Sequence, residues 1–187
     1  MGALLWIIVA LVILIILGAI LWSVSRKQRT EQLRGQFGPE YERTVQQHQN
    51  PRTAEAALED RRRRVEQLHI QSLSRGERER YEAAWHQVQG RFVDDPVGSM
   101  AQADRLVGEV MQARGYPMGD FETRAADISV DHPQVVENYR AAHEIALRTQ
   151  RGQATTEELR QAMVHYRALF SDLLMASPAP DEMEVRR

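Results

Sequence analysis

The chain contains no cysteine among its 187 residues. That absence excludes disulfide bonds, thiolate nucleophiles and cysteine-ligated zinc sites. Strand signals are missing as well, because no two segments of alternating polarity flank a hairpin turn. Long segments of helical periodicity are present instead. The sequence therefore predicts an all-α protein.

Charge is absent from residues 3–22. A helix of this length spans about 30 Å, which matches the hydrocarbon thickness of a bilayer. The segment has no polar face, and Trp6 and Trp22 lie near its two ends, where indoles favour the membrane interface. Residues 1–25 are therefore predicted to form a single transmembrane anchor.

A cleaved signal peptide is the competing interpretation of this segment. It would need a basic amino-terminal region, a shorter apolar run and a small-residue cleavage site. Here only Met1 and Gly2 precede the run, which favours an uncleaved anchor. No Lys or Arg precedes the span, whereas Arg26, Lys27 and Arg29 follow it. The positive-inside rule then predicts a cytoplasmic carboxy-terminal domain, with an extracytoplasmic domain as the alternative, and these three basic residues at the membrane interface.

Charge is unevenly distributed beyond the anchor. Residues 26–64 contain ten basic and six acidic residues, a net charge of +4, whereas residues 65–187 contain fourteen and twenty, a net charge of −6. Each basic residue beside a membrane contributes about 1 kcal/mol of binding free energy with anionic lipid headgroups. The acidic distal part argues against a nucleic-acid partner. The bilayer and its anionic headgroups are the partners that charge predicts.

Residues 26–73 are polar, with helix-start signals at Pro39 and at Asn50-Pro51. Few large apolar residues occur, so this segment is expected to be a basic helical stalk or linker that is exposed or orders with a partner. Partial disorder is the alternative. The run Arg61–Arg64 suggests a phosphate, lipid or RNA contact. A solvated helix surface is the favoured interpretation, because four consecutive residues point around the whole helix and acidic residues lie at pairing distance.

Residues 74–176 show the clearest helical pattern. Four main helices are predicted at about 75–93, 96–114, 133–151 and 156–175, with a short one near 120–127, and their short connections favour a compact bundle. Ser74 with Glu77 and Thr155 with Glu158 fit capping boxes. The Asp residues of segment 127–133 are interpreted as caps for the helix that starts at Pro133. The Pro-rich, acidic tail, 177–187, is predicted to be disordered.

Reactive motifs are scarce. None of the six histidines has the H-E-x-x-H spacing, and the chain contains neither a P-loop nor a nucleophile elbow. His86, His143 and His165 are weak candidates for a metal or ligand site within the bundle, although hydrogen-bonded structural histidines are the favoured interpretation. No catalytic residue and no cofactor is predicted.

Four phrases carry a resemblance: RYEAAW at 80–85, QGRFVDDP at 89–96, RGYP at 114–117 and DISVDHPQVV at 127–136. Across about residues 31–175 the chain resembles an uncharacterised family of short, membrane-anchored helical proteins, often labelled "secreted", mostly from actinobacteria and soil bacteria. The resemblance implies a bacterial cell membrane and supplies no catalytic residue. The expected function is a non-enzymatic, single-pass membrane protein whose helical domain binds a protein partner or itself; a ligand- or metal-binding sensor, or an enzyme, using the bundle histidines is the alternative.

Overall fold

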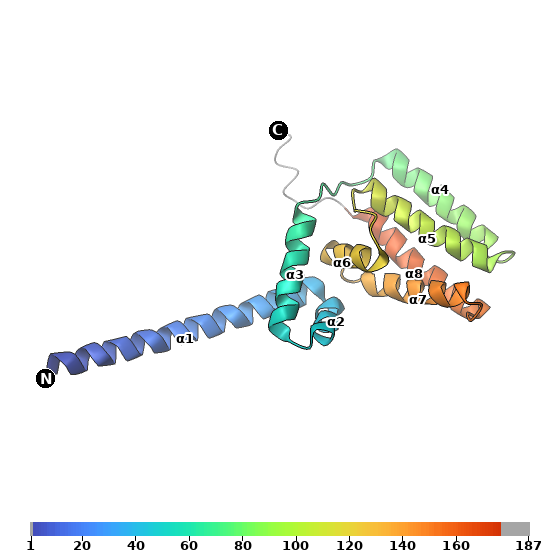
Figure 1. Ribbon diagram of the computed structural model, residues 1–187. Helices are drawn as coiled ribbons and strands as arrows, with labels where there is room; N and C mark the ends of the chain where they lie inside the picture. Colours follow the sequence, from blue (N-terminus) through green and yellow to red (C-terminus); the bar gives the residue numbers. More distant parts are fainter. Residues whose placement is uncertain (1, 177–187) are drawn as a thin grey trace, which may run out of the picture.

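The computed structural model describes the backbone of residues 2–176 and the side chains of residues 11, 14, 16–18, 20–21 and 23–176. This part of the chain is all-helical and has no strand, as predicted (Figure 1). Its helices are α1 (Gly2–Phe37), α2 (Pro39–His48), α3 (Pro51–Glu66), α4 (Arg75–Arg91), α5 (Pro96–Ala113), α6 (Phe121–Asp131), α7 (Val136–Gln150) and α8 (Thr156–Met175). The predicted tail, 177–187, lies outside the described residues.

Helix α1 projects away from the other helices for most of its length (Figure 1). It ends where Gly38 takes a positive φ of 51°, and Pro39 then opens α2. In the portion with described side chains, no helix has a stretch long and apolar enough to cross a membrane. The side chains of Trp6 and Trp22 lie outside that portion.

The compact bundle is confirmed. Helices α4, α5, α8 and α7 pack in that order, each against the next. Both predicted capping boxes are present, since Ser74 and Thr155 exchange hydrogen bonds with Glu77 and Glu158. Trp85 of α4 stacks on Phe170 of α8 with ring centroids 4.7 Å apart, which joins the outer helix to the middle of the bundle.

The predicted helix boundary at Pro133 is wrong. The short helix α6 continues to Asp131, and α7 begins at Val136. Asp127 lies inside α6 with a buried side chain, and Asp131 accepts a hydrogen bond from the Tyr116 hydroxyl at 2.7 Å. Neither residue caps the next helix, because both carboxylates bond to other parts of the chain: Asp127 through Oδ1 to Arg64, and Asp131 to Tyr116.

The segment expected as a stalk is helical, but it folds back on itself. The last turns of α1 pack with α2 and α3 to form what we call the N-terminal unit, residues 26–66. Its small core contains Leu33, Phe37, Tyr41, Leu58 and Val65, together with Val130 from α6. Figure 1 shows α3 running across α1 with α6 between α3 and the bundle. The sequence does not reveal this packing, because the six residues of the small core come from four different helices.

A buried ion network joins the N-terminal unit to the bundle. Glu40 of α2 is 1 % exposed, and its Oε1 accepts hydrogen bonds from Arg140 Nη2 of α7 at 2.9 Å and Arg61 Nη1 of α3 at 3.2 Å. Arg61 also donates to Ser129 of α6 at 3.0 Å, and Arg140 donates to Glu122 at 2.6 Å. The network fixes α2 and α3 against α6 and α7, and so fixes the base of α1 to the bundle.

Candidate functional site: a basic cavity at the base of α1

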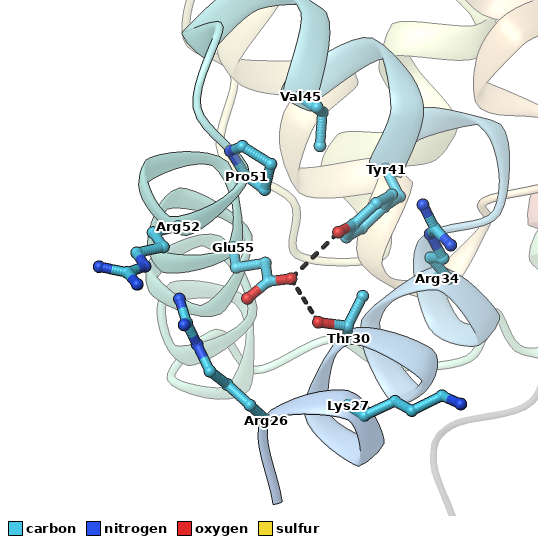
Figure 2. Close-up of a pocket in the computed structure, with 9 residues that line it drawn as sticks. All are labelled: Arg26, Lys27, Thr30, Arg34, Tyr41, Val45, Pro51, Arg52 and Glu55. Atoms are coloured by element: carbon cyan, nitrogen blue, oxygen red, sulfur yellow. Dashed lines mark hydrogen bonds between the residues drawn. The ribbon is translucent and has the colours of Figure 1, made fainter. Parts of the chain in front are cut away.

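A cavity of about 350 Å³ lies where α1, α2 and the start of α3 meet (Figure 2). We call it the basic cavity. It is lined by Arg26, Lys27, Thr30 and Arg34 of α1, Tyr41 and Val45 of α2, and Pro51, Arg52 and Glu55 of α3. Residues from three helices therefore converge on one space, immediately after the apolar part of α1.

Hydrogen bonds to Glu55 hold the walls of the basic cavity together. Its Oε1 accepts from the Thr30 hydroxyl at 2.7 Å and from the Tyr41 hydroxyl at 3.0 Å, so one carboxylate ties α3 to both α1 and α2 (Figure 2). Burial and the hydrogen bond to Glu55 raise the pKa of Tyr41, which keeps its hydroxyl a proton donor. At the start of α3 the Asn50 side chain accepts from the backbone N–H of Arg52 at 2.9 Å, which positions Arg52 at the cavity edge.

The lining residues give the basic cavity a net charge of +3, from four cations and one carboxylate. Arg34 contacts Glu42 at 3.3 Å and lies 5.1 Å from the centre of the Tyr41 ring. Within the described part of the chain, Lys27 and Arg52 form no salt bridge. Figure 2 shows Arg26 and Arg52 on one side of Glu55, with Arg34 on the other, next to Tyr41. These charges favour an anion, because cationic side chains line the cavity on both α1 and α3.

Two of the three basic residues predicted at the membrane interface line this cavity. Arg26 and Lys27 do so, whereas Arg29 forms a bidentate salt bridge with Glu59 of α3 and braces the crossing of the two helices. Sequence reasoning missed Arg34, Arg52 and the other lining residues. The net +4 of segment 26–64 signalled a basic surface, but only the return of α3 onto α1 gathers those charges around a cavity.

The three candidate histidines are not brought together. His86 is exposed beside a shallow groove of about 200 Å³ between α4 and α8. The His143 ring stacks on Phe121 at 3.5 Å, and burial lowers its pKa. His165 Nδ1 lies 2.8 Å from the Asn138 amide oxygen. Among the described residues, no group of three or more His, Cys, Asp or Glu side chains is placed to hold a metal ion.

The run Arg61–Arg64 divides between two roles. Arg62 and Arg63 pair locally with Glu66 and Asp60 on the surface of α3, as a solvated helix face would. Arg61 and Arg64 instead reach other helices, and Arg64 Nε donates to the buried Asp127 of α6 at 2.9 Å. The run is therefore partly a joint between α3 and α6, a role that neither sequence interpretation included.

A second polar centre lies at the carboxy-terminal end of α6, around His132. Arg114, 2 % exposed, donates from Nη1 to the Leu173 carbonyl at 3.1 Å and contacts His132 Nε2 at 3.2 Å. Because Arg has no acceptor, Nε2 must be the unprotonated nitrogen of the His132 ring. Nδ1 then carries the proton and donates a hydrogen bond to the Asp172 carboxylate of α8. His132 is thus neutral, consistent with burial that lowers its pKa despite the contact with Asp172.

No protein-family model, curated protein or solved structure matches this chain. The basic cavity and the way α1 is attached to the bundle therefore carry the functional argument.

Proposed function

We propose that this protein is a single-pass membrane protein that holds a helical interaction domain at the cytoplasmic face of a bacterial inner membrane. The observation that carries the proposal is the exposed apolar surface of α1. Its described apolar side chains before Arg26 are half or more exposed: Leu11, Leu14, Ile16, Leu17, Ile20, Leu21 and Val24. A contiguous apolar surface of this kind needs a covering, and the uncharged sequence from residue 3 to residue 22 fits a bilayer.

The rigid attachment of the bundle to α1 supports a role in which the bundle is held in place to bind a partner. Helix α1 continues without a break from its apolar part into the N-terminal unit, and Glu40 joins that unit to α7 through Arg140. No flexible linker separates the apolar part of α1 from the small core. A bundle fixed in this way would face the cytoplasm in one orientation, which favours binding of a protein partner or a second copy. We propose binding rather than catalysis as its role.

A topology experiment tests the proposal. The full chain is fused at its carboxy terminus to a reporter active only in the cytoplasm or to one active only outside it. We expect the cytoplasmic reporter alone to be active and the fusion to stay with the membrane after alkaline carbonate washing. Activity of the external reporter would overturn the orientation, and release by carbonate would overturn the anchor.

A variant with Arg26, Lys27 and Arg29 all changed to Gln tests the cause of the orientation. We expect part of the chains to invert, because these are the basic residues nearest the apolar segment. The matched control changes Arg78, Arg105 and Arg151, three exposed residues of the bundle, to Gln. It should keep the cytoplasmic signal, and equal inversion of both triple variants would contradict the role of the flanking charges.

A further inference from the structure

We propose that the basic cavity binds the phosphate of an anionic phospholipid headgroup. The inference rests on the proposed membrane anchor, and it adds to that proposal a defined lipid site. Four cationic side chains from α1 and α3 line the cavity, and two of them, Lys27 and Arg52, form no salt bridge within the described part of the chain.

The position of the cavity selects a lipid as the source of the phosphate. Arg26 lies four residues beyond Trp22, about 6 Å along the helix, and Thr30 lies about 12 Å along it. The polar headgroup layer extends about 5–8 Å beyond the hydrocarbon on each side of a bilayer. If the apolar segment spans the membrane, the part of the cavity lined by Arg26 and Lys27 lies at the depth of the lipid phosphates.

The size of the cavity selects a headgroup. At about 350 Å³ it lies at the small end of ligand pockets, about 300–1,000 Å³, so it holds a phosphate with a small polar substituent and leaves the acyl chains outside. The acyl chains would then run along the exposed apolar surface of α1, past residues such as Leu21 and Val24. One lipid molecule would satisfy both the charge of the cavity and the apolar helix above it.

Glu55 is the one lining group that repels an anion, and its contacts limit that repulsion. Two hydroxyls, from Thr30 and Tyr41, donate to its Oε1 and disperse the charge. The start of α3 adds favourable potential, because its first turn contains no acidic residue and the positive end of its helix dipole faces Pro51 and Arg52. The net attraction for a phosphate therefore remains.

The experiment measures thermal unfolding of the full chain in detergent micelles, so that it does not depend on membrane insertion. The added probes are a short-chain phosphatidylglycerol, the matching phosphatidylcholine and inorganic phosphate. A ligand that binds the folded state raises the unfolding temperature as its concentration increases. We expect phosphatidylglycerol to do so and phosphatidylcholine, whose headgroup has no net charge, to have little effect.

The double variant Lys27→Gln/Arg52→Gln should bind phosphatidylglycerol at least about tenfold more weakly, from two lost charge contacts. Both side chains are exposed at the cavity edge, so the fold should persist, and unfolding without added lipid checks this. The matched control, Arg78→Gln/Arg105→Gln, removes two exposed charges of the bundle and should bind as the unchanged protein does.

Three results would overturn the site. Equal stabilisation by both lipids would show general lipid binding without headgroup recognition. Stabilisation by inorganic phosphate and none by phosphatidylglycerol would assign the cavity to a soluble phosphate. Equal weakening in the cavity variant and the bundle variant would remove the cavity from the explanation. Each result leaves the topology experiment standing, so failure of the lipid site is distinct from failure of the anchor.

Discussion

The bundle and the N-terminal unit are both helical, but different forces hold them together. The bundle has a large apolar core in which Tyr139, Tyr166 and Leu169 are almost completely buried. The N-terminal unit has a core of a few residues, and the ion network around Glu40 fixes it to the rest. Helix α6 belongs to both, with Ile128 in the large core and Val130 in the small one. A region with little apolar surface can therefore be ordered when paired charges such as Glu40 and Arg140 connect it to a larger core.

The largest effect should come from removing the Glu40 carboxylate. Glu40→Ala leaves the buried Arg140 and the partly buried Arg61 without their shared partner, and breaking a buried pair costs about 3–5 kcal/mol. We expect the free energy of unfolding, measured by urea denaturation of the full chain in detergent, to fall by that amount. The amides of α2 and α3 should also lose protection from hydrogen exchange.

Glu42→Ala is the matched control, because Glu42 lies on the same helix with an exposed side chain and one surface pair to Arg34. Surface pairs contribute about 0–1 kcal/mol, so this variant should be nearly as stable as the unchanged protein. Equal losses in the two variants would show that the network around Glu40 does not join the two regions.

Two leucines with no exposed surface allow the two cores to be compared directly. Leu58 lies in the N-terminal unit and Leu169 in the bundle, and truncation of either to Ala should cost about 2–5 kcal/mol. Hydrogen exchange shows which helices each substitution destabilises. Leu58→Ala should reduce protection in α2 and α3 alone, whereas Leu169→Ala should reduce it throughout the bundle. Uniform loss of protection in the Leu58 variant would mean that the two regions unfold as one unit.

Sequence reasoning succeeded in the bundle and failed in the N-terminal unit for a physical reason. Apolar periodicity and capping boxes such as Ser74 with Glu77 are local signals, and they located α4, α5 and α8 closely. Glu40 and Arg140 are a hundred residues apart, and no local pattern indicates that they meet. The basic cavity also depends on tertiary packing, because Arg52 and Arg26 line the same space only after α3 folds back onto α1. Composition predicted its charge, and tertiary structure supplied its shape.

The connection between the two regions offers a backbone test. Gln71 N–H donates to the Arg114 carbonyl at 2.8 Å, so the segment after α3 lies against the end of α5. Gly115 there has φ +97°, and an added Cβ would overlap the carbonyl oxygen of His69. Gly115→Ala should therefore cost about 2–4 kcal/mol, from a strained φ and a steric overlap.

Gly152→Ala provides the control for that backbone effect. Gly152 has φ +69° but no atom within 4 Å of an added Cβ, so only the strain of about 1–2 kcal/mol should remain. Thermal unfolding of the two variants measures the difference. Equal losses of stability in the two variants would show that the connecting segment shifts to accommodate the new methyl group. That segment would then not fix the position of the N-terminal unit relative to the bundle.

The smallest expected effect is a pH dependence at His132, where the end of α6 meets the bundle. Burial lowers the pKa of His132 below its ordinary value of 6.5, and nearby Arg114 acts in the same direction, while Asp172 and Asp131 oppose it. The unfolded chain therefore binds a proton at a pH where the folded chain does not. Stability from this site is complete above pH 6.5 and falls as the pH drops from 6.5 toward the folded pKa.

His132→Gln removes the titrating group and should flatten that part of the stability profile, even if the variant is less stable overall. NMR titration of the His132 ring in the full chain in detergent should give a midpoint below 6.5 with the proton on Nδ1. A midpoint above 6.5 would mean that the contact with Asp172 outweighs burial and Arg114. Below that midpoint His132 would be charged in the folded protein, and Arg114 would have to turn away from Nε2. The bundle end of α6 would then also depend on ion pairing at that pH, as the N-terminal unit does.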